Sequence, residues 1–172
     1  MKIAVVYWSG TGNTEAMAGA VCDGARSAGA EVLLFTSGEF DESKANDFDA
    51  IAFGCPAMGA EALEEGEFEP MFAACEPKLG GKRIALFGSY GWGDGEWMRS
   101  WEERCAGAGI TLAAESVLAH EAPDDDADDE LSLTVASVRV EFFLAYTDGT
   151  AAATYSSLPS MPIISTIMGQ AR

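Results

Sequence analysis

The residues whose types and spacing are most suited to binding a ligand form a short turn near the start of the chain. They combine two glycines with four hydrogen-bonding side chains: Ser9, Gly10, Thr11, Gly12, Asn13 and Thr14. The apolar run 1–8 precedes them and predicts a buried strand, and 14–28 follows with helical periodicity. Because the free N–H groups and the dipole of a helix N-terminus attract negative charge, this unit predicts an anion site.

Two widespread phosphate-binding motifs do not fit this turn. A Walker loop ends in Gly-Lys-Ser or Gly-Lys-Thr, but the residues here are Asn13, Thr14 and Glu15, without a lysine. A dinucleotide fingerprint needs a third glycine at the position of Glu15. We interpret the turn as a cradle of hydroxyl and backbone N–H donors for a monophosphate. The alternative is an ordinary connecting turn rich in Ser, Thr and Gly.

Two later loops carry glycines beside large apolar side chains. The first follows a predicted strand at 50–55 and contains Pro56, Ala57, Met58, Gly59, Ala60 and Glu61. The second follows a predicted strand at 83–89 and contains Ser89, Tyr90, Gly91, Trp92, Gly93, Asp94 and Gly95. Glycine lets the backbone approach a ligand closely, and a rigid aromatic ring on such a loop can stack on a flat ligand. The alternatives are core positions for Trp92 and Met58.

The elements that carry these loops alternate between strands and helices. The predicted strands are 1–8, 31–36, 50–55, 83–89 and a stretch within 110–118, and the predicted helices are 14–28, 97–108 and a short one at 43–46. This alternation predicts an α/β fold, with a parallel sheet covered on both faces. Ligands of such sheets bind beyond the carboxyl ends of the strands, so the three loops should meet in one crevice.

The composition is that of one globular domain. Of the 172 residues, 48% are hydrophobic, and no apolar run is long enough to cross a membrane. The sequence also shows no leader pattern at its start, and together these features predict a cytoplasmic monomer. The four cysteines are widely spaced and are predicted to be free thiols. The net charge of −18 argues against nucleic acid and favours a basic protein partner, with solubility alone as the alternative explanation.

Three motifs resemble the short-chain bacterial flavodoxins. They are Thr11-Gly12-Asn13-Thr14, Ala57-Met58-Gly59 and the stretch 88–95, and the similarity extends over about residues 1–130, including 64–70 and the helix that begins at Glu96. The resemblance implies a doubly wound five-stranded parallel sheet of order 2-1-3-4-5 with FMN at the switch point. Flavodoxin is itself the standard example of that order, so the order is not an independent prediction.

The resemblance also implies roles for the loop residues. Ser9 to Thr14 would hold the FMN phosphate, and Met58 and Trp92 would cover the two faces of the isoalloxazine ring. Gly59 would turn its carbonyl toward reduced flavin N5–H, Glu61 would accept from N3–H, and the backbone of 89–91 would contact the pyrimidine end. Nearby acids would disfavour an anionic, fully reduced flavin.

The function implied is that of a low-potential one-electron carrier with tightly bound FMN, which cycles through a neutral semiquinone and serves redox protein partners. A protein with this function would carry electrons and would not turn over a substrate as an enzyme does. The first alternative is an FMN-dependent quinone or flavin reductase on the same fold, which would need a second substrate space that Trp92 should obstruct. The second is a flavin-free binding module, which would leave the loop glycines without a purpose.

Three positions depart from the family pattern. Pro56 stands where a hydroxyl residue is usual, so the resemblance implies one cofactor hydrogen bond fewer, and Ala60 stands where aspartate is frequent. His120 lies in a stretch that replaces an asparagine-containing loop, and we assign it no chemistry.

The composition changes toward the C-terminus. Only two of the 28 acids, Glu141 and Asp148, follow residue 130. The acidic run 124–130 is interpreted as a solvated helix start, with a partner-binding patch as the alternative. Leu131, Val135, Val138 and Phe142 predict a last helix, although 138–142 also alternates as a strand does. We assign 1–146 to the flavodoxin-like domain and 147–172 to an atypical C-terminal extension.

Overall fold

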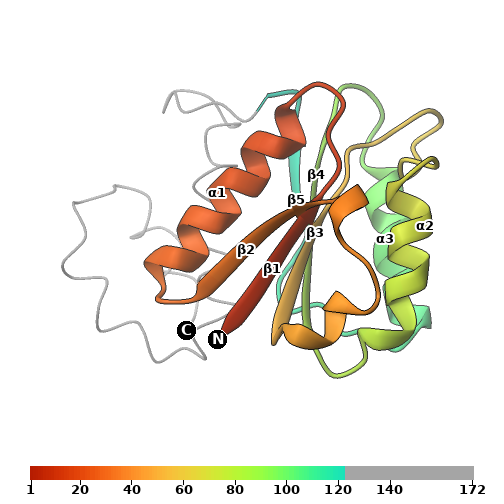
Figure 1. Ribbon diagram of the computed structural model, residues 1–172. Coiled ribbons are helices and arrows are strands. Elements are labelled where there is room, and N and C mark those ends of the chain that lie inside the picture. Colours follow the sequence, from red (N-terminus) through yellow and green to blue (C-terminus); the bar gives the residue numbers. More distant parts are fainter. Residues whose placement is uncertain (123–172) are drawn as a thin grey trace, which may run out of the picture.

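The structure, a computed structural model, describes residues 1–122 (Figure 1). Its strands are β1 (Lys2–Tyr7), β2 (Glu31–Thr36), β3 (Ala50–Gly54), β4 (Arg83–Tyr90) and β5 (Val117–His120). Its helices are α1 (Asn13–Ser27), α2 (Phe68–Cys75) and α3 (Glu96–Gly107), with short 3-10 helices η1 (Ser37–Glu39), η2 (Lys44–Asp47) and η3 (Glu76–Lys78). The predicted last helix, the acidic run and the extension lie outside the described residues, so the assignment of the domain remains a prediction.

The five strands form one parallel sheet in the order β2-β1-β3-β4-β5, which confirms the predicted fold class. The order reverses between β1 and β3, because the chain leaves β1 for β2 on one side and returns to β3 on the other. In such a sheet the crevice for a ligand lies at this switch point. The turn after β1 and the loops after β3 and β4 all run over the same end of the sheet (Figure 1).

The burial of three of the strands, β1, β3 and β2, follows from their positions in the sheet. Every residue of β3 and all but the first of β1 are buried, as continuous apolar runs predict for strands covered on two faces. The edge strand β2 is more exposed, and its Leu33 and Leu34 belong to the exposed large apolar side chains.

Helices cover both faces of the sheet. Helix α1 lies on one face, and α2 and α3 lie on the other (Figure 1). Phe72 and Trp101 pack edge-to-face, with ring centroids 5.3 Å apart, where α2 meets α3. Arg104 of α3 adds ion pairs to Glu69 at 2.7 Å and Glu76 at 3.1 Å on the α2 side.

The ends of several elements differ from the prediction by one or two residues. The stretch within 110–118 overlaps β5 at only two positions, because β5 begins at Val117. Leu112 makes an isolated parallel bridge to Ile84 of β4, and the chain bends away before β5 starts. The stretch therefore meets β4 in two separate places, and the strand predicted within it lies at its C-terminal end and continues to His120.

Helix α2 was not predicted. Its sequence signal is the spacing of four buried residues: Phe68, Met71, Phe72 and Cys75. Pro70 obscures that signal, because proline usually breaks helices but is tolerated in the first turn, where it stands here.

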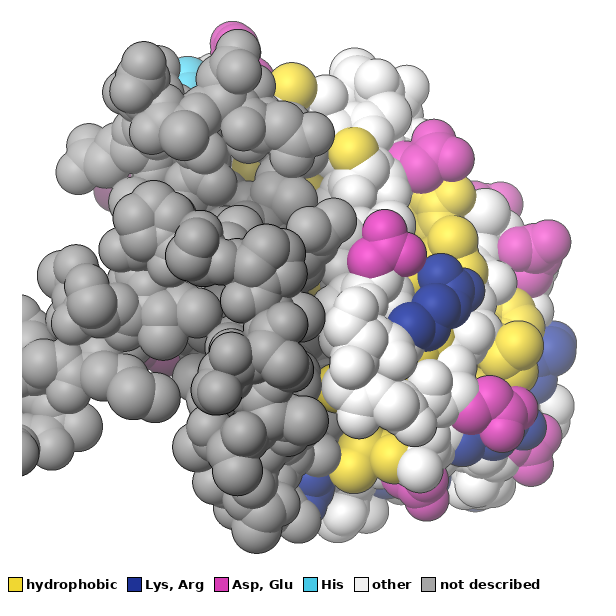
Figure 2. Space-filling model, turned by 90° about the vertical axis from the view of Figure 1, so that its left-hand side faces the viewer, with side chains coloured by type: hydrophobic (Ala, Val, Ile, Leu, Met, Phe, Trp, Pro, Cys, Tyr) yellow, Lys and Arg dark blue, Asp and Glu magenta, His cyan; other side chains and the backbone are white. Residues whose placement is uncertain are grey.

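The four cysteines are free, as predicted, and all four are buried: Cys22, Cys55, Cys75 and Cys105. Among residues 1–122, no helix is long and apolar enough to cross a membrane. On the face drawn in Figure 2, acidic side chains lie at several separate places rather than in one patch.

Candidate functional site

The turn after β1 presents a helix N-terminus that no side chain caps. Gly12 is the N-cap residue of α1, with φ +94°, and its own N–H donates to Ser9 Oγ at 3.1 Å. The Ala16 N–H is bonded to the Gly12 carbonyl at 2.9 Å. The N–H groups of Asn13, Thr14 and Glu15 come before that bond, and α-helix geometry gives them no acceptor within the helix. The turn therefore has a row of backbone donors of the kind that the predicted anion site requires.

The loop after β3 is a tight hairpin. Met58 and Ala62 exchange two backbone hydrogen bonds, each 2.8 Å long. Between them Gly59 has φ +51° and Glu61 has φ +50°. A positive φ is accessible to glycine without a steric penalty, but it is unusual for glutamate. The strain at Glu61 is tolerated because the side chain is held in place.

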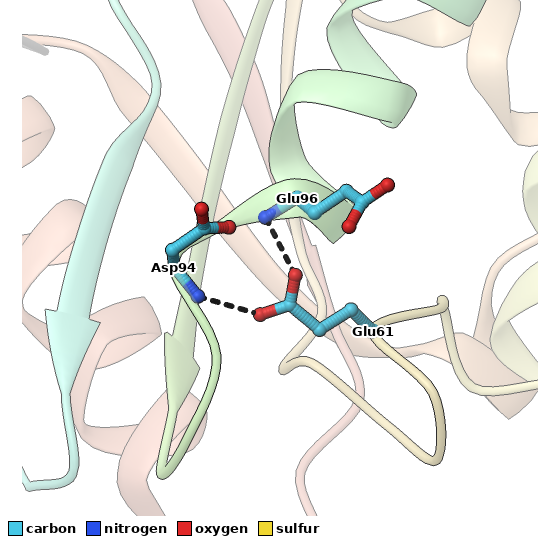
Figure 3. A group of neighbouring side chains, drawn as sticks. All are labelled: Glu61, Asp94 and Glu96. Carbon is cyan, nitrogen blue, oxygen red and sulfur yellow. Dashed lines mark hydrogen bonds between the residues drawn. The ribbon is translucent and has the colours of Figure 1, made fainter.

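The Glu61 carboxylate connects this hairpin to the start of α3 (Figure 3). One oxygen accepts from the Asp94 N–H at 2.9 Å and the other accepts from the Glu96 N–H at 2.8 Å. Gly95, the N-cap residue of α3, has no side chain to make these bonds, so Glu61 supplies the cap from 35 residues away. Each carboxylate oxygen keeps a second lone pair, which leaves room for the predicted bond to a flavin N–H.

The same contact explains Gly93. A Cβ at this position would displace the Glu61 carboxylate from its place, and the positive φ of Gly93 also favours glycine here. Glu61, Trp92 and Asp94 line a shallow pocket of about 390 Å³ together with Ala60, Gly93 and Glu96. The pocket joins the loops after β3 and β4, and the turn after β1 lies outside its lining.

Trp92 is exposed, which rules out the core alternative for this residue. It has 64% of its surface accessible, whereas Trp97 and Trp101 each have 1%. Met58, at 37%, is also exposed. Exposed indole and thioether groups on glycine-containing loops are suited to covering the faces of a flat ring.

Two hydrogen bonds tie all three loops together. Thr14 Oγ1 and Ser89 Oγ lie 2.9 Å apart, and the Ala57 N–H donates to the Ser89 carbonyl at 2.9 Å. The three predicted segments therefore meet at one end of the sheet, as the parallel topology requires.

Acidic groups dominate the electrostatics of the rim. Glu61, Asp94 and Glu96 have carboxylate oxygens within 4.8 Å of one another. Arg99 pairs with the Asp94 carboxylate at 2.7 Å and also donates to its carbonyl at 2.8 Å. Exposed acids alone do not define a cation site, and the Asp94 carboxylate is already paired with Arg99. The rim is therefore better described as a negative border than as a metal centre.

Burial makes the thiol next to the site inert. Cys55 directly follows β3, and desolvation raises its pKa to about 12, although the Glu64 N–H donates to Sγ at 3.4 Å and opposes the shift. A thiol with that pKa is protonated at neutral pH and is a poor nucleophile.

The sequence did not identify every residue at this rim. Glu96 lines the pocket, and its N–H is one of the two groups that Glu61 binds. Its position directly after Gly95, at a helix start, was the available signal. His120 packs edge-on to Tyr90 with ring centroids 5.1 Å apart, and the Glu121 N–H donates to the Tyr90 carbonyl at 2.7 Å. These contacts support the second loop structurally.

The donor set fits a flat ligand with one phosphate. The uncapped start of α1 supplies neutral donors for the phosphate. Two exposed apolar side chains, Met58 and Trp92, lie on separate loops, and acidic side chains border the pocket beside Trp92. No lysine or arginine belongs to the turn itself, which extends from Ser9 to Thr14.

Comparisons with known proteins agree with this geometry. The family model described as Flavodoxin matches residues 5–133. A flavodoxin from Megasphaera elsdenii is 46% identical over 126 residues, which are 72% of this chain and 89% of that relative. A flavodoxin from Clostridium beijerinckii is 44% identical over 121 residues, 70% of this chain and 88% of that relative. The solution structure of two-electron reduced Megasphaera elsdenii flavodoxin superposes with a TM-score of 0.72 at 39% identity, covering 82% of this chain and 98% of that one.

Proposed function

Because this chain belongs to the flavodoxin family, whose members bind FMN and carry electrons rather than turn over substrates, we propose that it is a low-potential one-electron carrier. FMN, when bound, supplies the redox chemistry, since it can accept and release electrons one at a time. The observation that carries the proposal is the meeting of an uncapped helix N-terminus with two loops that expose Met58 and Trp92. The reductase alternative has no support in the relatives, which are named flavodoxins.

We assign the two ends of the cofactor to different loops. The phosphate belongs at the N-terminus of α1, where the residues that bind it are Ser9, Gly10, Thr11, Gly12, Asn13 and Thr14. The ring belongs between Met58 and Trp92, with Pro56, Ala57, Gly59, Ala60 and Glu61 on one loop and Ser89, Tyr90, Gly91, Gly93 and Asp94 on the other. This assignment leaves Trp92 partly open to a redox partner.

The protein favours neutral over anionic flavin. Glu61, Asp94 and Glu96 place negative charge beside the ring site, so adding a second negative charge there is unfavourable. Gly59 supports the same preference, because a backbone free to rotate can offer its carbonyl to a protonated flavin nitrogen. Two separate one-electron steps follow, with a neutral one-electron-reduced flavin between them and the second step at low potential.

The partners we propose are redox proteins with basic docking surfaces. The net charge of −18 would accelerate their approach and would repel nucleic acid. We also propose a cytoplasmic monomer, which is consistent with buried free thiols.

Binding of FMN tests the first part of the proposal. Adding the flavin-free chain to micromolar FMN should quench the flavin fluorescence, because the indole of Trp92 stacks on the ring. Replacing Trp92 with leucine should reduce both the quenching and the affinity. The matched control is Ser27→Ala, at the far end of α1, which should bind FMN normally. Unchanged flavin fluorescence at micromolar wild-type protein would refute the proposal.

Spectroelectrochemistry tests the second part. The loaded protein should take up two electrons in two resolved steps, and the intermediate spectrum should be that of a neutral rather than an anionic flavin. A single two-electron wave would contradict one-electron transfer while leaving FMN binding intact.

A further inference from the structure

A buried pair of hydroxyl groups links the phosphate turn to the strand of the ring-binding loop. Thr14, the second residue of α1, is 1% exposed, and Ser89, near the end of β4, is 4% exposed. Their oxygens lie 2.9 Å apart although the residues are 75 positions apart in sequence. Because β3 separates β1 from β4 in the sheet, this bond joins two parts of the site that no strand pairing connects.

Packing alone does not require this pair. Among residues 1–122, only Thr14, Ser37 and Ser89 are polar side chains in the buried class. Burying a hydroxyl costs free energy that a hydrogen bond mainly offsets, and a pair of apolar side chains would fill the same space without that cost. A role in the site accounts for the polar choice.

The chemistry of the pair points to the phosphate. Each hydroxyl carries one proton, and the bond between the two oxygens uses one of them, so one donor remains. The Thr14 N–H lies in the first turn of α1, which no side chain caps. Fixing the Thr14 side chain through Ser89 therefore also fixes a backbone donor of the anion site.

We propose that Ser89 is a positioning residue for the phosphate, acting through Thr14, and that it thereby helps the protein select FMN over riboflavin. The inference rests on the proposed function, but it moves the Ser89 side chain from the ring side of the site to the phosphate side. The turn contains no lysine or arginine, so discrimination depends on neutral donors, and weakening one of them has a measurable effect.

The test is the ratio of the riboflavin dissociation constant to the FMN dissociation constant. Both are measured by flavin fluorescence on the full chain freed of cofactor. Ser89→Ala should lower the ratio about tenfold through weaker FMN binding, with riboflavin affinity unchanged. Thr14→Val, which removes a hydroxyl of the phosphate turn itself, should lower the ratio at least as far, and Thr14→Ser, which keeps the hydroxyl, should retain the wild-type ratio. The double variant should be no worse than Thr14→Val alone, because Ser89 acts only through the Thr14 side chain.

Two controls separate this role from general destabilisation. Trp92→Leu should weaken both flavins by the same factor and leave the ratio unchanged, because it alters only the ring side. Ser27→Ala removes an exposed α1 hydroxyl that donates to the Asp23 carbonyl, and it should change neither constant.

The result is decisive in either direction. A wild-type ratio in Ser89→Ala and Thr14→Val, or an equal loss for both flavins, would overturn the inference. If Ser89→Ala does not fold, Ser89→Cys takes its place, because a thiol is a much weaker hydrogen-bond donor than a hydroxyl. A wild-type chain without affinity for FMN would instead refute the proposed function.

Discussion

Gly59 has the backbone conformation on which the proposed redox behaviour depends. It lies at φ +51° in a hairpin that Met58 and Ala62 close with two hydrogen bonds. For a residue with a Cβ, a left-handed conformation costs about 1–2 kcal/mol. Each kcal/mol of differential stabilisation shifts a one-electron potential by about 43 mV, because tenfold corresponds to 59 mV.

Replacing Gly59 should therefore change the yield of one-electron-reduced flavin. We expect Gly59→Val to lower that yield in a reductive titration, because a β-branched residue resists positive φ. Gly59→Asn should retain more of it, since asparagine tolerates this conformation. Equal yields in the two variants would show that backbone freedom at this position does not control the intermediate.

At the scale of elements, Glu61 holds the hairpin after β3 against the start of α3. Its two oxygens accept the N–H groups of Asp94 and Glu96. Glu61→Ala should raise the hydrogen-exchange rates of those two amides about fivefold, because losing a cap costs about 1 kcal/mol. NMR on the flavin-free chain measures both rates.

A neighbouring acid provides the control for this prediction. Glu65 is exposed in the following segment, and Glu65→Ala should leave both amides protected. Protection that persists in Glu61→Ala would mean that the helix start is held by other contacts.

Glu64 performs a related task for α2. One of its oxygens accepts from Gly66 N–H, and the other accepts from Glu67 N–H and Phe68 N–H, all at 2.8 Å. Partial burial alone would raise the pKa of Glu64, but these bonds outweigh it and hold the pKa below its ordinary value. The charged form is thus preferred in the folded state.

This preference gives stability a defined pH dependence. The contribution of Glu64 is present above its ordinary pKa of about 4.3 and is lost as the pH falls through the lowered folded value. Glu64→Gln should therefore reduce the loss of urea stability between pH 7 and pH 3. The same substitution at Glu65 should leave that loss at its wild-type size, and an identical loss in Glu64→Gln would contradict the assignment.

For the whole molecule, every residue assigned to the site lies within residues 1–122, the part of the chain that the structure describes. The three loops, the five strands and three helices all lie within that range. A chain ending at Tyr146 should therefore retain solubility and the wild-type affinity for FMN, as the assignment of the domain to 1–146 predicts. Fluorescence titration of the two chains side by side provides the measurement. Aggregation or weaker binding of the shorter chain would show that 147–172 is needed.

The sequence by itself determined the fold class and the three loops of the candidate site. Continuous apolar strands alternating with helices specify a parallel sheet, and parallel strands bring the loops after β1, β3 and β4 to one end. Local patterns of this kind are readable because burial on two faces demands them. Helix α2 is not predicted from the sequence because Pro70, a residue that usually breaks helices, lies in its first turn.

Only the tertiary structure decided which groups meet across the loops. Glu61 caps a helix 35 residues away, and Thr14 bonds to Ser89 75 residues away. Such contacts depend on the separation of two loops to within an ångström, whereas hydrophobic periodicity reports only which face of an element is buried. The exposure of Trp92 was decided in the same way, because its surroundings come from the folded loops rather than from its neighbours in sequence.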